Sequence, residues 1–298
     1  MKQDYHDLLK PGIINSLSGL ALIARVVVDG YLSGLNHSRR LGPGMEFSQY
    51  RGYEPGDDMR LLDWKMLARS GRYYIKQSEV ESNIAVKFIL DSSKSMLHEE
   101  DGLTKMDHVR VLVASLAYFA QNQGDAVGLF ALNDRNLHSL YPRVQKQHFN
   151  RLLLELINIQ NEGKWPTNPM AGEKLHDRRH KELIFFITDM YENTSEITDH
   201  VTKLKTPRNE VVLLHVMGKK ELEFNYKGTV TFEDLETGNR LKVNAIEARR
   251  NYLEIIHSMI ETTKSKLLAN GIGYHLFRLD EPIGEALQIL LKKRISLL

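Results

Sequence analysis

Short runs of consecutive apolar residues alternate with helical patterns along most of this 298-residue chain, and this alternation constrains the fold more than any other feature. Such runs cover residues 84–90, 126–132, 183–188 and 211–216. They lack the polar residue at every second position that a half-exposed strand shows, so we expect strands buried on both faces. Strands of this kind separated by helices predict the doubly wound α/β class, a mostly parallel sheet with helices on both faces.

The segments between the strands carry apolar residues at helical spacing and end at residues that break helices. Gly124-Asp125 closes one such pattern, and Asn270-Gly271 closes another before a further strand expected at 272–277. Residues 137–141 can pair beside the strand at 126–132. Helices are expected at residues 104–123, 147–160, 195–205, 245–269 and 283–295.

Two segments near the N-terminus stand apart from this pattern. Residues 5–32 show one apolar helical stripe, which predicts an N-terminal helix. Residues 37–79 mix glycine, proline and charge with short Tyr- and Ile-bearing stretches, which predicts a small β-rich or irregular module. We therefore expect a first domain at 1–80 and an α/β domain at 81–298. A turn-rich tetrapeptide, Glu236-Thr237-Gly238-Asn239, predicts a β-hairpin inserted near 228–244 at the sheet edge.

Composition argues against several classes of protein. The 40 Lys and Arg residues nearly balance the 38 Asp and Glu residues, so no bulk field would attract nucleic acid or an anionic membrane. The chain has no cysteine, which rules out disulfides and thiolate metal sites. Arg25 and Asp29 interrupt the most apolar stretch, at 13–35, so we expect no transmembrane segment and a cytoplasmic location.

Acidic side chains end two of the expected strands. Asp91 follows the run at 84–90, and Asp189 follows the run at 183–188. Doubly wound sheets bind ligands outside the carboxyl ends of their strands, where the strand order reverses, so we expect both carboxylates in one crevice. Ser93 and Ser95 follow Asp91 at a spacing of two and bring hydroxyls to the same side of one tight loop. Hard oxygen ligands of this kind suit Mg²⁺ or Mn²⁺.

The segment from Ile89 to Met96 resembles the Asp-x-Ser-x-Ser motif of von Willebrand factor A domains, which follows the first strand of that fold. The resemblance implies a divalent cation at a metal-ion-dependent adhesion site, completed by a Thr from a second loop and an Asp from a third. Asp189 matches the third loop. Thr167 is the best match in the second loop, although Trp165-Pro166 stands where the family usually has Gly-Gly.

A second resemblance is strong over residues 40–96. The stretch Arg51-Gly52-Tyr53-Glu54-Pro55-Gly56-Asp57-Asp58-Met59-Arg60, continued by Leu62-Asp63-Trp64-Lys65 and Ala68-Arg69, resembles the signature of the DUF58 family of bacteria and archaea. That family joins this segment to a von Willebrand A-like domain. Its members are commonly encoded beside a MoxR-type AAA+ ATPase, so the likeness implies such a partner.

The charged residues of this signature allow two interpretations. Asp57, Asp58, Arg60 and Asp63 are candidates for binding a partner. With Arg69 and Arg72, they could instead form an ion-pair network that braces the module against the main domain.

Several enzyme classes lack the residues that they need. Aspartyl phosphatases of the haloacid dehalogenase type need a second Asp two residues after the nucleophile, where this chain has Ser93. The phosphate loop Gly-x-x-x-x-Gly-Lys-Ser/Thr and the Gly-x-Ser-x-Gly elbow are absent from the sequence. We therefore expect a non-enzymatic adaptor.

In this adaptor a divalent cation accepts a carboxylate from a protein partner at an open coordination position. The expected ligands of Mg²⁺ or Mn²⁺, direct or through water, are Asp91, Ser93, Ser95, Thr167 and Asp189. Three alternatives remain open: a loop that keeps the fold but binds no ion, a metal-assisted hydrolase, and a metal-free scaffold that binds through the DUF58-like segment. The sequence leaves the oligomeric state open.

Overall fold

The structure is a computed structural model that describes residues 5–38, 50–52, 64–76, 84–166, 181–192 and 194–297. The chain divides into two compact units, one formed by residues 1–31 with 84–297 and the other by residues 32–83. The described part of the N-terminal segment up to Tyr31 therefore belongs with the α/β unit. The predicted domain boundary, between residues 80 and 81, falls in the segment 77–83, outside the described residues.

A six-stranded sheet forms the centre of the larger unit, with the strand order β12-β9-β8-β3-β6-β7 in its described part. Strand β7 is antiparallel to β6, and the other neighbouring strands are parallel. The chain runs from β3 to β6 on one side and returns to β8 on the other, so the strand order reverses between β3 and β8. The strands are β3 (Ala85–Asp91), β6 (Ala126–Leu132), β7 (Leu137–Arg143), β8 (Glu182–Thr188), β9 (Asn209–Met217) and β12 (Gly273–Arg278).

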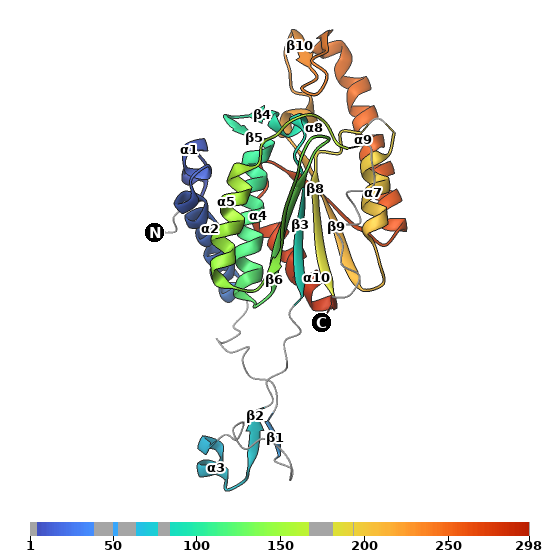
Figure 1. Cartoon of the computed structure of the whole chain (residues 1–298). Coiled ribbons are helices and arrows are strands. Elements are labelled where there is room, and N and C mark those ends of the chain that lie inside the picture. Colours follow the sequence, from blue (N-terminus) through green and yellow to red (C-terminus); the bar gives the residue numbers. More distant parts are fainter. Residues whose placement is uncertain are drawn as a thin grey trace. The chain divides into compact units, whose positions relative to one another are not determined.

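Helices cover both faces of this sheet, as Figure 1 shows. Helix α4 packs with α10 on one face, and α7 packs with α9 on the other. Thr104, the residue before α4, caps that helix through a capping box with Asp107, which satisfies main-chain donors at the helix start. The predicted doubly wound α/β class is confirmed. The helices are α4 (Lys105–Asn122), α5 (Lys146–Asn158), α7 (Glu196–Leu204), α9 (Ala245–Ala269) and α10 (Gly284–Leu297).

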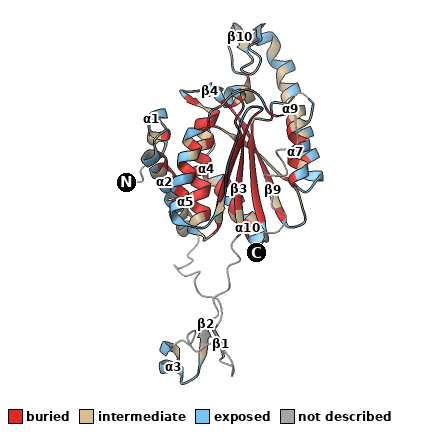
Figure 2. Ribbon diagram, viewed as in Figure 1, coloured by how far each residue is buried: buried red, intermediate tan, exposed pale blue. Residues whose placement is uncertain are grey.

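The central strands are buried on both faces, which is why their sequences are continuous apolar runs (Figure 2). Phe88 of β3 stacks on Phe185 of β8 with ring centroids 5.8 Å apart. The next residue, Ile89, points to the opposite face and joins the cluster packed under α7 and α9. Trp165, from the loop after α5, closes this cluster by packing edge-on against Phe186 at 5.4 Å.

The N-terminal segment differs from the single helix expected at 5–32. It forms a short 3₁₀ helix η1 (Tyr5–Leu8), then α1 (Pro11–Ile14) and α2 (Leu17–Ser38). The Ser16 hydroxyl donates to Ile13 O at 2.9 Å and accepts from Gly19 N at 3.2 Å, so it ends one helix and caps the next. No helix in the described residues is long and apolar enough to cross a membrane.

The smaller unit contains a short antiparallel pair, β1 (Tyr50–Gly52) with β2 (Tyr74–Lys76), and the helix α3 (Trp64–Ser70). The partner-binding candidates Asp57, Asp58, Arg60 and Asp63 all lie in the segment 53–63, outside the described residues. The choice between an ion-pair network and a partner-binding surface therefore stays open.

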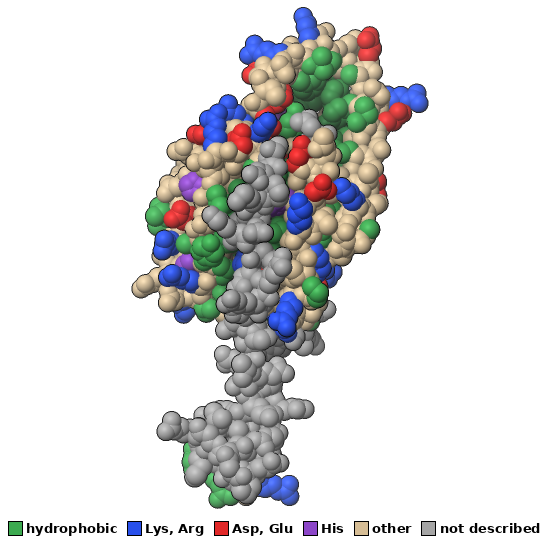
Figure 3. Space-filling model, turned by 45° about the vertical axis from the view of Figure 1, so that its right-hand side comes forward, with side chains coloured by type: hydrophobic (Ala, Val, Ile, Leu, Met, Phe, Trp, Pro, Cys, Tyr) green, Lys and Arg blue, Asp and Glu red, His purple; other side chains and the backbone are tan. Residues whose placement is uncertain are grey.

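The predicted hairpin is confirmed, with β10 (Thr229–Glu233) antiparallel to β11 (Arg240–Asn244). Its expected place at the edge of the main sheet was wrong, because β12 pairs with β9 there and the hairpin forms a separate two-stranded sheet. Hydrophobic side chains gather on the surface at the end of the larger unit that carries the hairpin (Figure 3). There Leu241 of β11 is 64% exposed, and Ile246, at the start of α9, is 75% exposed.

Four short elements among the described residues lie around the carboxyl ends of the strands. They are the 3₁₀ helix η3 (Lys94–Leu97), the antiparallel pair β4 (Glu99–Glu100) and β5 (Leu103–Thr104), and the helix α8 (Lys219–Glu223).

Candidate metal centre

Asp91 is the last residue of β3 and is 1% exposed. Its Oδ1 accepts a hydrogen bond from the main-chain N–H of Ser93 at 2.9 Å. Its Oδ2 accepts from the hydroxyl of Thr188, the last residue of the neighbouring strand β8, at 2.8 Å. Two adjacent strands and the start of the loop therefore fix the orientation of this carboxylate at the point where the strand order reverses.

Ser93, Ser95 and Asp189 lie beside Asp91. The Ser93 and Ser95 hydroxyl oxygens are 2.8 Å apart, and the Ser95 hydroxyl donates to Asp189 Oδ1 at 3.1 Å. The structure thus brings together Asp91, Ser93, Ser95 and Asp189, four of the five predicted ligands. Whether they bind a metal stays a prediction.

The loop that leads to Thr167 lies against the motif loop. The main-chain N–H of Glu162 donates to Ser92 O at 3.0 Å, and that of Lys94 donates to Gly163 O at 3.2 Å. Gly163 has φ +59, a conformation that glycine adopts without strain. Thr167 itself falls in the segment 167–180, outside the described residues, so its role as a ligand stays a prediction.

Lys105 is a member of the site that the sequence did not reveal. It begins α4, is 3% exposed, and donates from Nζ to Asp189 Oδ2 at 3.1 Å and to Glu221 Oε1 at 2.8 Å. Burial alone would lower the pKa of Lys105, but the two carboxylates raise it above its ordinary value. Burial would likewise raise the pKa of Asp189, yet Lys105 holds it below its ordinary value. Both groups are therefore charged.

Glu236, in the turn of the inserted hairpin, is a second residue that the sequence did not point to. Burial, and then the charges of Asp91 and Asp189, raise its pKa to about 7, while interaction with the Ser93 hydroxyl lowers it. Its Oε1 is buried and has no hydrogen-bond partner among the described residues. The hairpin therefore brings a third carboxylate to the same loop.

Negative charge exceeds positive charge in this buried region. Burial, and then the charge of Asp189, raise the pKa of Asp91 to about 6. The described residues place one buried ammonium group, that of Lys105, among the carboxylates of Asp91, Asp189, Glu221 and Glu236. Carboxylate and hydroxyl oxygens are ligands that Mg²⁺ and Mn²⁺ accept, and a divalent cation would neutralise the excess charge. The residues present therefore fit such an ion.

The main chain at Asp189 is held by a neutral imidazole. Burial lowers the pKa of His215, on β9, to about 4. Its Nε2 lies 3.1 Å from Asp189 O and its Nδ1 lies 2.7 Å from the Tyr274 hydroxyl. Because a carbonyl only accepts, Nε2 carries the proton and Nδ1 accepts from the tyrosine. Met190, the next residue after Asp189, has φ +55, which is strained for a side chain of this type.

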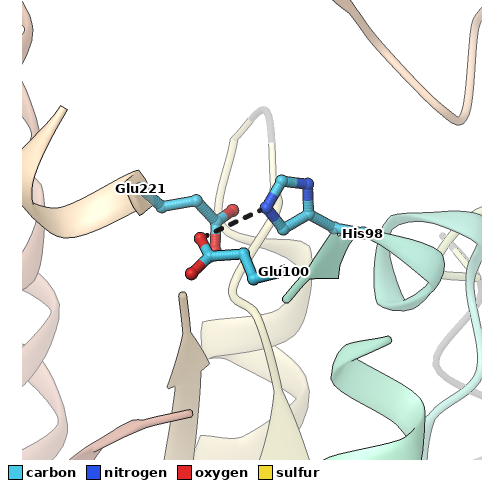
Figure 4. A group of neighbouring side chains, drawn as sticks. All are labelled: His98, Glu100 and Glu221. Atoms are coloured by element: carbon cyan, nitrogen blue, oxygen red, sulfur yellow. Dashed lines mark ion pairs between the residues drawn. The ribbon is translucent and has the colours of Figure 1, made fainter. Parts of the chain in front are cut away.

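A neighbouring group of His98, Glu100 and Glu221 has the spacing of a metal site, but its carboxylates already have a structural role (Figure 4). Both oxygens of Glu100 accept from the main-chain N–H of Lys220, at 3.0 and 3.2 Å. Glu221 Oε2 accepts from the N–H of Gly218 at 2.7 Å. These carboxylates cap the start of α8.

Comparisons with known proteins agree with the signature at the N-terminal side. Residues 49–259 match the family described as "Protein of unknown function DUF58". "Uncharacterized protein Rv1480" from Mycobacterium tuberculosis (strain ATCC 25618 / H37Rv) is 22% identical over 235 residues, which cover 78% of this chain and 74% of that protein.

Two solved structures are among those to which this chain is similar. The conserved hypothetical protein BatB from Bacteroides thetaiotaomicron is 15% identical to this chain and has a TM-score of 0.49. The matched region covers 72% of this chain and 100% of the BatB chain. The von Willebrand factor type A structure from Catenulispora acidiphila is 12% identical and has a TM-score of 0.35. The matched region covers 60% of this chain and 43% of that chain.

Proposed function

The chain belongs to the DUF58 family, and from this premise we propose that it is a protein-binding module whose contact with its partner depends on Mg²⁺ or Mn²⁺. Asp91, Ser93, Ser95 and Asp189, together with Thr167, hold the cation directly or through water. The bound cation supplies a position that accepts a carboxylate from the partner.

The observation that carries this proposal is the hydrogen-bonded chain from Ser93 through Ser95 to Asp189, next to the buried Asp91. Two nearby basic side chains among the described residues, those of His215 and Lys105, do not activate these hydroxyls. His215 is neutral and its Nε2–H points at a main-chain carbonyl, while Lys105 is charged and paired. Glu236, whose pKa is raised to about 7, is a candidate general base, so a metal-assisted hydrolase is the second candidate function, and turnover of phosphoesters that chelation abolishes would favour it.

We further propose that the partner is a MoxR-type AAA+ ATPase, because the resemblance of residues 51–69 to the family signature implies one. Exposed apolar side chains such as Leu241 and Ile246, on the same side of the unit as the metal centre, supply contact area of the kind that protein interfaces bury. Nucleic acid is not proposed as a partner, and the cytoplasmic location stays a prediction.

Titration calorimetry with Mn²⁺ and Mg²⁺ tests the metal site. We expect the native chain to bind one ion and Asp91→Ala to lose that binding. Asp199→Ala is the matched control, because Asp199 is an exposed aspartate of α7 with a side chain 57% exposed. Equal binding by all three proteins, or no binding by any of them, would contradict the proposal.

Capture of the ATPase on the immobilised full chain tests the partner. We expect capture in Mg²⁺ and its loss in EDTA and in Asp91→Ala. Capture that is insensitive to EDTA but lost on substitution of Asp57 and Asp58 would instead support the metal-free scaffold.

A further inference from the structure

We propose that the β10–β11 hairpin is an internal ligand of the metal centre, with the Glu236 carboxylate in the position that a partner's carboxylate takes. In this arrangement the hairpin turn has to leave before a partner binds, so the chain inhibits its own binding site. This inference rests on the proposed metal site and names what occupies its open position when no partner is present.

The placement of Glu236 is costly in the absence of a cation. Its carboxylate lies beside the Ser93 hydroxyl, and Asp234 of the same turn accepts a hydrogen bond from Tyr191, two residues after Asp189. A buried oxygen without a hydrogen-bond partner loses its solvation. Glu236 Oε1 has no such partner among the described residues. A divalent cation held by Glu236 and the motif loop would remove this cost.

Contacts at the tip hold the turn over the site but are exposed. The Tyr191 hydroxyl donates to Asp234 Oδ2 at 3.1 Å, and the Tyr191 main-chain N–H donates to Asp189 Oδ1 at 3.3 Å. Tyr191 therefore ties the loop of one metal ligand to the hairpin turn. Both hydrogen bonds are exposed, so water replaces them at little cost when the turn moves away.

The base of the hairpin is attached more firmly than its tip. Phe232 of β10 packs against Phe224 at 5.6 Å and against Tyr226 at 5.1 Å between ring centroids, and Phe224 packs against Tyr252 of α9 at 4.4 Å. An aromatic base and a tip held by exposed hydrogen bonds allow the turn to lift while the hairpin stays attached. Leu241, which is exposed on β11, is then available to a partner that displaces the turn.

The test compares the native chain with Glu236→Ala, and uses Mn²⁺ and acetate as the probes. Calorimetry measures the affinity for Mn²⁺, and the relaxation rate of water protons reports how many water molecules the bound Mn²⁺ carries. We expect Glu236→Ala to bind Mn²⁺ about tenfold more weakly or worse. We expect its bound Mn²⁺ to relax water faster, and acetate to reverse that gain in the variant but to have no effect on the native chain.

Glu233→Ala is the matched control, because Glu233 is an exposed glutamate of the same hairpin, paired with Arg240. It should behave like the native chain. If the native chain binds Mn²⁺ and Glu236→Ala shows the same affinity and the same water relaxation, the internal ligand is refuted while the metal site stands. If the native chain binds no Mn²⁺, the metal site and the internal ligand are both refuted.

Discussion

Replacing Lys105 with Met removes the buried ammonium group that neutralises Asp189. Methionine is close to lysine in length and flexible, so it fills the space without adding charge. Lys105 lies between Asp189, whose side chain is 4% exposed, and Glu221, whose side chain is 22% exposed. Removing one partner of a buried ion pair lowers the free energy of unfolding by about 3–5 kcal/mol, and most of this loss should come from Asp189.

A bound cation should restore part of that loss. A ligand present at 100 times its Kd raises the free energy of unfolding of any protein that binds it in the native state by about 2.7 kcal/mol. In Lys105→Met the ion meets a site with one more unneutralised carboxylate, so its affinity should rise by at least about tenfold, or about 1.4 kcal/mol. In Mg²⁺, the difference in free energy of unfolding between the native chain and Lys105→Met should therefore be smaller than in EDTA by at least about 1.4 kcal/mol.

Urea unfolding followed by circular dichroism, in EDTA and in saturating Mg²⁺, measures both quantities. Lys87→Met is the control, because the Lys87 side chain is 5% exposed and pairs with Glu182, which is 1% exposed, in the same sheet. Lys87 lies four residues before Asp91 on β3, or about 13 Å along the strand, so its loss should not depend on Mg²⁺. A deficit in Lys105→Met that Mg²⁺ leaves unchanged, or an equal response of Lys87→Met, would refute this reasoning.

Two predictions concern stability away from the metal centre. Arg294 Nε donates to Asp125 Oδ2 at 2.7 Å, with side chains 9% and 0% exposed, so Arg294→Met should lower the free energy of unfolding by about 3–5 kcal/mol. Arg250→Met, which breaks an exposed pair with Glu254, should change it by less than about 1 kcal/mol in the same urea assay; equal effects would contradict this account. Burial lowers the pKa of His200 from 6.5 to about 4, so the unfolded state takes up its proton first as the pH falls. The free energy of unfolding should therefore keep its full value above pH 6.5 and fall by up to about 3 kcal/mol between pH 6.5 and pH 4. In His200→Phe, the free energy of unfolding should depend less on pH over this range.

The positions of Asp91 and Asp189 could be predicted from the sequence because they depend on the strands alone. Each residue directly follows or ends a continuous apolar run, and parallel strands place their carboxyl ends at one edge of the sheet. Ser93 and Ser95 could be predicted as well, because their spacing from Asp91 lies within one short loop. The hydrogen bond from Thr188 to Asp91 needs the register of β3 with β8, which the sequence does not state.

Lys105 and Glu236 could not be predicted in the same way, because tertiary contacts bring them to the site. Lys105 is the first residue of α4, and the expected helix at 104–123 gave it no role. Its one signal is a lysine at a helix N-terminus, where the helix dipole disfavours a cation and a buried carboxylate partner can compensate. Glu236 appeared only as part of a hairpin turn, and its position depends on tertiary contacts of the separate two-stranded sheet, such as that between Asp234 and Tyr191.

The missed break in the N-terminal helix has a different cause. Ile14 of α1 and Leu20 of α2 are both fully buried, so the two helices keep one apolar stripe on either side of the break. Periodicity measures that stripe and cannot detect the interruption. The break depends on Ser16, whose hydroxyl ends α1 and caps α2.

The central claim is that the motif loop holds a divalent cation, and anomalous diffraction from crystals of the full chain grown with Mn²⁺ tests it most directly. We predict one dominant anomalous peak among the hydroxyl oxygens of Ser93 and Ser95 and the carboxylate of Asp189, absent from crystals of Asp91→Ala. A peak at His98 and Glu100 with none at the motif loop, or no bound Mn²⁺ at all, would contradict the account.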